Sequence, residues 1–259
     1  MAGEFDGKVA LVTGSSGIGL GAALKFAREG ASVHLCGIDE ALNRAAREQA
    51  EGLALTVHRV DLAVPEQIGM FVETAAADPG GIDIVVNAAG IQTYGTIEDT
   101  DLDHWERVMA INLRACYLTA HHAYWHMKPR GGGAIVHVSS VQGHANQYGV
   151  LAYATAKGAV HALTRAMAVD CARDNIRVNS VSPGSIRTPL LEYGAEQLAG
   201  EGQGVEEMIA QFGKAHPIGR VGTIEETAEL IAFLAGDRAG FCTGGDYLVD
   251  GGLLAHIGV

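Results

Sequence analysis

Three polar side chains in the middle of the chain have the types and spacing needed to move a proton. Tyr153 and Lys157 stand four residues apart on a predicted helix and so share one face of it, and Ser140 ends the strand predicted before it. A phenol loses its proton at about pH 10, and a nearby ammonium group favours the phenolate, so Lys157 is expected to lower the pKa of Tyr153. The set predicts a base that accepts a hydroxyl proton, although a tyrosine–lysine pair at this spacing, taken alone, is also common as an ordinary helix pair.

A glycine-rich turn follows the first predicted strand. The strand Lys8–Thr13 leads into Gly14-Ser15-Ser16-Gly17-Ile18-Gly19, where a helix is expected to begin. Glycines permit a tight turn and a close approach of the backbone to a pyrophosphate, and a helix N-terminus offers free N–H groups and the positive end of its dipole. The position of the turn therefore predicts dinucleotide binding, whereas a glycine-rich turn alone is a weak signal.

Apolar runs rich in β-formers alternate with helical patterns along the chain. Runs such as residues 9–12 show no alternation, which is typical of parallel strands covered on both faces. Right-handed crossovers then predict a single α/β domain over residues 1–259, a doubly wound Rossmann sheet of about seven parallel strands that binds ligands at the carboxyl ends of its strands. Residues 185–220 contain no predicted strand and are expected to form a helical substrate lid.

The predicted elements are read from these runs and from the turn residues between them. The strands are Lys8–Thr13, Ser32–Cys36, Leu55–Val60, Ile82–Asn87, Ala134–Ser139, Arg177–Ser182 and Asp246–Val249. The helices after the first are Glu40–Glu51, Pro65–Ala77, His104–Lys128, Ala152–Arg173 and Ile224–Ala235.

The composition excludes several classes of protein. Of 259 residues, 48% are hydrophobic and 19% are charged, which rules out general disorder. The net charge of −12 disfavours nucleic-acid binding, and no apolar run approaches the length of a membrane span. The four cysteines are far apart and the first residues do not resemble a secretory signal, so a reducing, cytoplasmic environment is expected.

These motifs, in this order, resemble those of the short-chain dehydrogenase/reductase family over nearly the whole chain. Ser140, Tyr153 and Lys157 match the family's serine and its Tyr-x-x-x-Lys motif, and Asn112 matches the fourth member of its tetrad. The resemblance implies an enzyme that transfers a hydride between a secondary alcohol or carbonyl and a nicotinamide cofactor. Family members are usually homotetramers, so a homotetramer is expected.

The resemblance also implies a role for each member of the tetrad. Tyr153 is expected to take the hydroxyl proton, Ser140 to position the substrate oxygen, and Lys157 to hold the nicotinamide ribose as well as to supply charge. Asn112 is expected to fix a water molecule next to Lys157. General acid–base catalysis of this kind contributes about 10²–10⁴-fold to a rate.

The expected cofactor contacts come from the same resemblance. Family members usually carry three residues between Thr-Gly and Gly-x-Gly, whereas only Ser15 and Ser16 intervene here, so the turn is one residue short. The residues expected to bind the cofactor are Gly14, Ser16, Gly17, Ile18, Gly19, Asp39, Asp61, Leu62, Asn87, Ala88, Gly90, Tyr153, Lys157, Pro183, Gly184, Ile186 and Thr188.

The choice between NAD and NADP depends on the end of the second strand. The family usually has an aspartate directly after the position of Cys36, where this chain has Gly37. Asp39 follows two residues later and is either a partner for the ribose hydroxyls or simply the cap of the next helix. Because no lysine or arginine stands in this region to bind a 2′-phosphate, NAD is expected in preference to NADP.

The polar residues near the predicted site favour a small polyhydroxylated substrate, such as a sugar or polyol. The C-terminal part resembles family members that oxidise aldoses such as L-fucose, and the chain is also similar to NAD-dependent members of the 17-beta-hydroxysteroid type. The expected substrate contacts are Gln92, Ser140, Gln142, His144, Gln147, Arg187 and His256.

Two alternatives to this interpretation stay open. One is an NADPH-dependent carbonyl or 3-oxoacyl reductase, and the other is a non-catalytic dinucleotide-sensing protein, which would not need the proton-transfer residues. A metal site is not expected, because His121, His122 and His126 on a predicted helix lack a third ligand.

Overall fold

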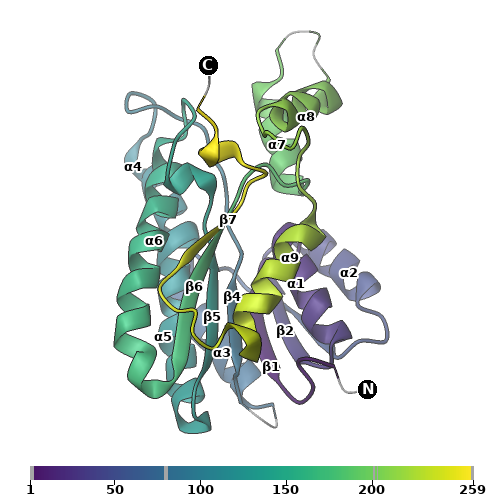
Figure 1. The fold of residues 1–259 in the computed structure, drawn as a ribbon, viewed down its shortest axis with the longest axis vertical. Helices are drawn as coiled ribbons and strands as arrows, with labels where there is room; N and C mark the ends of the chain where they lie inside the picture. Colours follow the sequence, from purple (N-terminus) through teal and green to yellow (C-terminus); the bar gives the residue numbers. More distant parts are fainter. Residues whose placement is uncertain (1–2, 79–80, 201, 203, 258–259) are drawn as a thin grey trace.

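The protein is built on one parallel sheet of seven strands, described by a computed structural model (Figure 1). The structure describes residues 3–78, 81–200, 202 and 204–257. The strand order β3-β2-β1-β4-β5-β6-β7 confirms the predicted doubly wound Rossmann fold. The strands are β1 (Val9–Thr13), β2 (Ser32–Gly37), β3 (Leu55–Arg59), β4 (Ile84–Asn87), β5 (Gly133–Val138), β6 (Ile176–Pro183) and β7 (Asp246–Val249).

Helices cover both faces of this sheet, as Figure 1 shows. One layer contains α1 (Gly17–Arg28), α2 (Glu40–Gln49) and α9 (Ile224–Ala235). The other contains α3 (Pro65–Ala76), α4 (Leu102–Met109), α5 (Ala115–Met127) and α6 (Leu151–Cys171). Two further helices, α7 (Pro189–Leu198) and α8 (Val205–Lys214), stand beyond the carboxyl ends of the strands, within the segment expected to be a lid.

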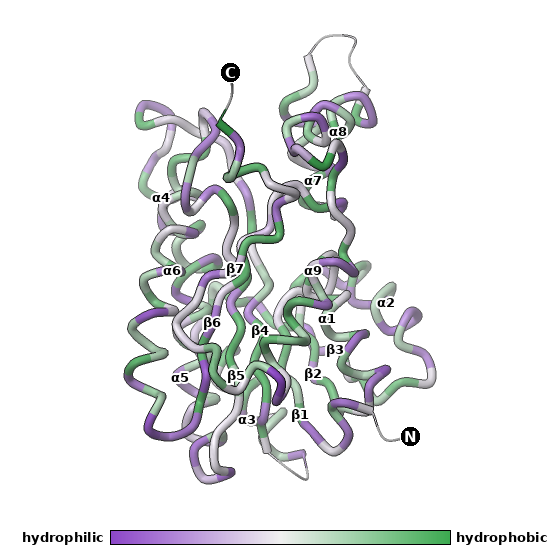
Figure 2. The backbone as a smooth tube through the Cα atoms, in the orientation of Figure 1, coloured by the Kyte–Doolittle hydropathy of each residue, from purple (hydrophilic) through white to green (hydrophobic). Residues whose placement is uncertain are grey.

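The core lies on the two faces of the sheet, and the central strands β1 and β4 are hydrophobic along most of their length (Figure 2). On one face Phe26 and Ile231 pack against the sheet, and on the other Ile68 and Met127 do so. All four side chains are fully buried, and burial of each contributes about 1.5–3 kcal/mol to folding. The uninterrupted burial of β1 and β4 explains why these runs show no alternation in the sequence.

The helix predicted over His104–Lys128 is interrupted by a π-helical turn. α4 ends at Met109, the turn occupies Ala110–Arg114, and α5 follows. The prediction of one regular helix was therefore wrong at this point. A π turn inserts one extra residue and changes the direction of the side chains after it, and such turns are frequent at functional sites.

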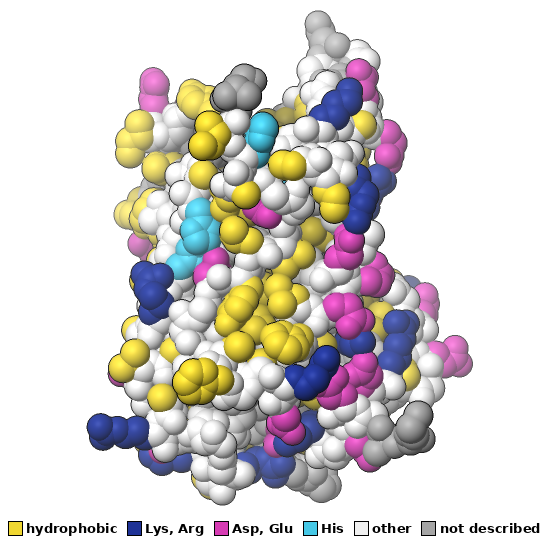
Figure 3. Space-filling view, viewed as in Figure 1, with side chains coloured by type: hydrophobic (Ala, Val, Ile, Leu, Met, Phe, Trp, Pro, Cys, Tyr) yellow, Lys and Arg dark blue, Asp and Glu magenta, His cyan; other side chains and the backbone are white. Residues whose placement is uncertain are grey.

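Part of the surface is hydrophobic. In Figure 3, hydrophobic side chains gather over β7 and α9, and Leu248 and Phe241 are exposed in and beside β7. Tyr117 and Trp125 on α5 and Val169 on α6 are exposed as well. None of the helices in the described ranges combines the length and the hydropathy that a membrane span requires.

Candidate active site

A cavity of about 970 Å³ opens at the carboxyl ends of the strands, where the strand order reverses between β1 and β4. Its floor is formed by the residues that follow β1, β2, β4, β5 and β6, and α7 and α8 contribute to its outer side. This is the position at which open α/β sheets bind ligands, because consecutive crossovers diverge there and leave a crevice.

Ser140, Tyr153 and Lys157 all line this cavity, and each is less than 10% exposed. β5 ends just before Ser140, whose Oγ accepts a hydrogen bond of 3.1 Å from the backbone N–H of Gln142. α6 carries the other two on one face, and Lys157 Nζ lies 5.6 Å from the centre of the Tyr153 ring. The structure thus brings the three residues together, as their spacing predicted.

Burial controls the proton affinity of these groups. Burial raises the pKa of Tyr153 to about 12, against a smaller lowering by a hydrogen bond from Ser140. Burial also lowers the pKa of Lys157, whose Nζ donates a 2.8 Å hydrogen bond to the carbonyl oxygen of Val138. Desolvation of the phenolate therefore dominates the pKa of Tyr153 in the protein alone, and the expected lowering, which depends on the positive nicotinamide ring as well as on Lys157, stays a prediction.

Asn112 lies in the π-helical turn behind the cavity and is fully buried. Its Oδ1 accepts a 2.9 Å hydrogen bond from the backbone N–H of Ile91, and its Nδ2 donates a 2.8 Å bond to the Ile91 carbonyl. A Cβ atom on Gly90 would lie 2.8 Å from Asn112 Oδ1 and 3.6 Å from Lys157 Nζ. Glycine at this position therefore allows the strand-end segment to pass close to both side chains.

The glycine-rich turn has the shape of a phosphate cradle. Gly14 (φ +98°) and Gly17 (φ +55°) adopt conformations that favour glycine, and both line the cavity. The N-cap of α1, Ser16, makes no side-chain hydrogen bond to the helix, so the first N–H groups stay available to an anion. The turn therefore fits a pyrophosphate although it is one residue short.

The short turn and Gly37 are structurally linked. A Cβ atom on Gly37 would collide with Ser15 Oγ, so the buried Ser15 side chain fills the space beside the end of β2. This contact explains why the residue after Cys36 is glycine. Asp39 follows as the N-cap of α2, its Oδ1 accepting a 2.9 Å hydrogen bond from the backbone N–H of Leu42, and it also lines the cavity. Asp39 can therefore cap α2 and also bind the ribose hydroxyls, because capping uses only one of its two carboxylate oxygens.

Most of the residues expected at the cofactor line the cavity, and two do not. Gly19 is buried beneath the turn, where a Cβ atom would collide with the carbonyl oxygen of Gly14. Asn87 is buried in β4, and its Nδ2 lies 3.2 Å from Nδ1 of His137. The lining residues are Gly14, Ser16, Gly17, Ile18, Asp39, Asp61, Leu62, Ala88, Gly90, Tyr153, Lys157, Pro183, Gly184, Ile186 and Thr188.

The expected substrate contacts divide in the same way. Gln92, Gln142, Gln147 and His256 line the cavity with Ser140. His144 does not, because its ring turns away to Asp246, with His144 Nε2 2.7 Å from a carboxylate oxygen. Arg187 also lies outside the lining and pairs with Glu192 and Glu206 on the surface. The prediction that His144 and Arg187 contact the substrate is therefore corrected, since neither side chain lines the cavity.

One side of the cavity is apolar and was not predicted from the sequence. Its side chains come from α7, α8 and the C-terminal segment, and they are Leu190, Leu191, Leu198, Phe212, Leu253 and Leu254. Tyr94, also missed, packs against Tyr153, and its Oη accepts a 3.2 Å hydrogen bond from Gln92 Nε2. The apolar residues of α7 and α8 recur at helical spacing, but the same pattern is found in helices that pack against an ordinary core, so it did not indicate a cavity wall.

Comparisons with known proteins agree with this geometry. The family model described as "Enoyl-(Acyl carrier protein) reductase" matches residues 12–254. Cyclohexanol dehydrogenase of an Acinetobacter strain is 37% identical, with 97% of this chain and 96% of that protein covered. This chain belongs to the short-chain dehydrogenase/reductase family. It is an oxidoreductase of the kind that acts on secondary alcohols and their carbonyl products, and it uses a nicotinamide cofactor.

Two other similar proteins carry different substrates in their names. The cis-4-hydroxycyclohexanecarboxylate dehydrogenase of Sinomonas cyclohexanicum is 39% identical, with 98% of this chain and 100% of that protein covered. The ligand-free aldohexose dehydrogenase of Thermoplasma acidophilum is a solved structure with a TM-score of 0.90 and 33% identity, and it covers 100% of this chain and 98% of its own. The family is thus secure, while its members differ in the alcohol they accept.

Proposed function

We propose that this short-chain dehydrogenase/reductase oxidises the CH–OH group of a ring alcohol with NAD as the hydride acceptor. The observation that carries the proposal is the presence of Ser140, Tyr153 and Lys157 in the same cavity as the glycine cradle of Gly14 and Gly17. Proton-accepting groups and a dinucleotide cradle in one cavity suit a reaction in which a proton and a hydride leave the same carbinol.

Each catalytic side chain has a task in this reaction. NAD, when bound, supplies the carbon that takes up the hydride. Ser140, at the end of β5, orients the substrate oxygen, and Tyr153 accepts its proton. Lys157 would hold the ribose, and its positive charge would stabilise the phenolate of Tyr153. Asn112 secures the segment at Ile91 against which Lys157 lies.

Because the pKa of Tyr153 is raised, the site must supply positive charge before this side chain can act as a base. A phenol with a pKa of about 12 keeps its proton at neutral pH, so Tyr153 needs added positive charge before it can accept a proton. Lys157 is the basic side chain beside its ring, although its own pKa is lowered by burial. We infer that Tyr153 acts as a base only after the cofactor is in place.

NAD is favoured over NADP by the residues that follow β2. Gly37, Ile38, Asp39 and Leu42 line this end of the cavity, and none of them is basic. The Asp39 carboxylate would accept hydrogen bonds from the ribose hydroxyls and repel a 2′-phosphate. The free carboxylate oxygen left after capping is the expected ribose contact.

The cavity lining favours a ring alcohol that is apolar but carries a second polar group. Leucine side chains from α7 and the C-terminal segment suit a hydrocarbon ring, in line with the ring alcohols named for two of the relatives. Tyr94, Gln92 and Gln147 form a polar cluster next to Tyr153 that suits the second group. The predicted sugar substrate stays a prediction, favoured by the same polar cluster.

The hydrophobic surface and the free thiols support the expected homotetramer in a reducing cytoplasm. Exposed hydrophobic side chains on α5 and α6, and the hydrophobic surface at β7, suit two different two-fold interfaces, which together would build a homotetramer. Cys36, Cys116, Cys171 and Cys242 are all free thiols, which suits a reducing cytoplasm. Light scattering on the purified protein tests the tetramer.

The test of the activity is a substrate panel followed by the absorbance of the reduced nicotinamide. Cyclohexanol, 4-hydroxycyclohexanecarboxylate and an aldohexose are each offered with NAD and with NADP. We expect the highest kcat/KM with NAD and the ring alcohol that carries a carboxylate. Reduction of neither cofactor by any secondary alcohol would refute the proposal, and faster turnover of the aldohexose would favour the sugar prediction. Assaying the matching ketones with NADPH tests the reductase alternative.

A further inference from the structure

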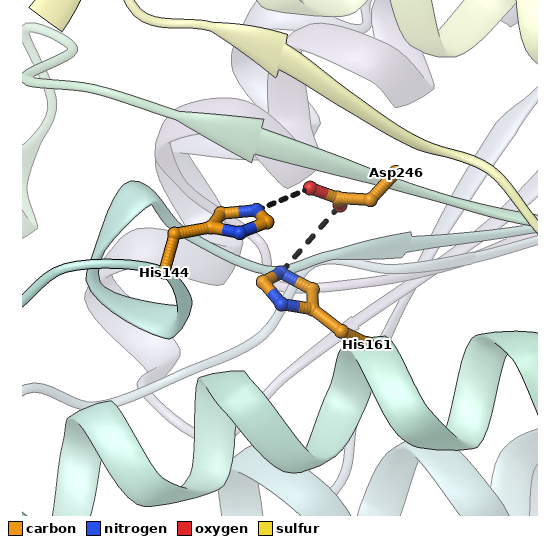
Figure 4. A group of neighbouring side chains, drawn as sticks. All are labelled: His144, His161 and Asp246. Carbon is orange, nitrogen blue, oxygen red and sulfur yellow. Dashed lines mark hydrogen bonds and ion pairs between the residues drawn. The ribbon is translucent and has the colours of Figure 1, made fainter. Parts of the chain in front are cut away.

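A second cluster of reactive side chains lies outside the cavity, between α6 and the start of β7 (Figure 4). It consists of His144, in the segment after Ser140, His161 on α6, and Asp246, the first residue of β7. His144 Nε2 is 2.7 Å from one carboxylate oxygen of Asp246, and His161 Nε2 is 3.5 Å from the other. None of these three side chains lines the catalytic cavity.

The donor set matches the preference of a borderline transition-metal ion. Figure 4 shows both imidazole rings directing a nitrogen at the same carboxylate, and one ligand atom from each residue lies within 4.8 Å of the others. In a tetrahedral zinc site with bonds of about 2.0–2.1 Å, neighbouring ligand atoms are about 3.3 Å apart. The two separations from the Asp246 carboxylate, 2.7 Å for His144 Nε2 and 3.5 Å for His161 Nε2, lie on either side of this value.

The surroundings suit such an ion. Ser180 Oγ donates a 2.6 Å hydrogen bond to Asp246 Oδ1, which fixes the carboxylate in the manner of an outer-shell partner. Ser182 Oγ lies 3.0 Å from His161 Nε2 and donates to the Asp246 carboxylate, so it borders the same cluster. His144 is partly exposed, so the cluster is accessible from solvent, while His161 is buried.

The composition of the cluster suits a cation. Asp246 supplies one carboxylate, and neutral imidazole is the form in which a histidine binds a metal. In the described part of the chain, the ion-pair partners of Asp246 are these two histidines.

We propose that His144, His161 and Asp246 bind one divalent transition-metal ion of the zinc class, with water or Ser182 as the fourth ligand. The site is structural. It joins the segment that follows Ser140, the helical turn after Lys157 and the edge strand β7, and so braces the elements that carry the catalytic side chains without entering the cavity. The competing interpretation is a hydrogen-bonded network without a metal.

Metal binding by the purified full-length protein distinguishes the two interpretations. The protein is stripped with a chelator, dialysed against micromolar ZnCl₂, and assayed for bound zinc and for its Tm. We expect one zinc per chain and, at a zinc concentration about a hundredfold above Kd, a rise in Tm of roughly 5 °C. Cobalt(II) is expected to give the visible absorption bands of a tetrahedral site.

His144→Asn and Asp246→Asn test the ligands, because both replacements keep hydrogen-bonding capacity. Each is expected to weaken zinc binding at least tenfold and to abolish the rise in Tm. The matched control is His126→Asn, which removes a histidine paired with a carboxylate elsewhere, since His126 Nε2 lies 3.0 Å from Glu73 Oε1. His126→Asn is expected to bind zinc like the unchanged protein. Less than one equivalent bound by the unchanged protein, or unaltered binding by His144→Asn, would overturn the proposal.

Discussion

The two sides of the catalytic cavity are built differently. The inner wall, made of the strand-end residues and the start of α6, holds Ser140, Tyr153 and Lys157 buried, with Ser140 and Lys157 hydrogen-bonded to the backbone. The outer wall, made of α7, α8 and residues 253–256, presents apolar side chains from elements that project beyond the sheet. Burial holds these groups in one position, so we infer that the inner wall determines the reaction and the outer wall the substrate.

The largest effect is expected at the inner wall, from Tyr153→Phe. This change removes the proton acceptor and leaves the ring in place, so kcat for alcohol oxidation should fall by about 10²–10⁴-fold. NAD binding, measured by titration, should change by no more than a few-fold. If turnover is retained, Tyr153 is not the base and the division between the two walls fails.

A buried histidine next to the inner wall predicts acid sensitivity. Burial lowers the pKa of His137 from 6.5 to about 4, so below pH 6.5 the unfolded chain binds a proton that the folded protein does not. Stability is therefore lost as the pH falls from 6.5 towards 4, by about 2 kcal/mol at about pH 5. Denaturant unfolding of His137→Gln should lack this part of the pH dependence.

The control for this measurement is His126→Gln, which changes a histidine on the surface and should keep the pH dependence of the unchanged protein. If His137→Gln and the unchanged protein lose stability in parallel between pH 7.5 and about pH 5, His137 is not held neutral by burial.

A smaller effect is expected where the inner wall meets the nucleotide. Asp39→Asn keeps a good N-cap for α2 but removes the negative charge. The value of kcat/KM for NAD should fall about tenfold, as expected for loss of a charge-assisted hydrogen bond. The ratio of kcat/KM with NAD to kcat/KM with NADP should also decrease. If the ratio of kcat/KM with NAD to kcat/KM with NADP does not change, Asp39 only caps α2. An unchanged Tm would show that α2 is intact.

The smallest effect is expected from Tyr94→Phe, at the boundary of the two walls. Tyr94 packs against Tyr153, and a Cβ atom on Gly194 of α7 would lie 2.9 Å from Tyr94 Oη. Removing this hydroxyl should lower kcat/KM about three- to fivefold for a ring alcohol with a second polar group and leave cyclohexanol unaffected. Equal losses for both substrates would assign Tyr94 a packing role instead.

The inner wall could be predicted from the sequence because its signals are local. Tyr153 and Lys157 are four residues apart on one helix, and Ser140 closely follows the end of β5, so the spacing places all three at one edge of the sheet. The positions of His144 and Arg187 relative to the cavity could not be predicted, because local spacing does not show which partner an exposed polar side chain binds. His144 binds Asp246, 102 residues away, and Arg187 binds Glu206.

The outer wall and the proposed metal site were not predictable for related reasons. Leu191 and Phe212 have the pattern of ordinary amphipathic helices, and whether such side chains face a core or a cavity depends on how the helices pack. The histidine and aspartate ligands come from three separate elements, so no short motif marks them. The π-helical turn at Asn112 is likewise a product of packing, because its residues are ordinary helix formers.

The central claim is that one cavity holds the dinucleotide against Ser140 and Tyr153, and a crystal structure with NAD and a ring alcohol tests it most directly. The account predicts the pyrophosphate at Gly14–Gly17, the ribose at Asp39, and the alcohol oxygen within hydrogen-bonding distance of both Tyr153 Oη and Ser140 Oγ. A dinucleotide bound elsewhere, or an alcohol oxygen held away from Tyr153, would contradict it.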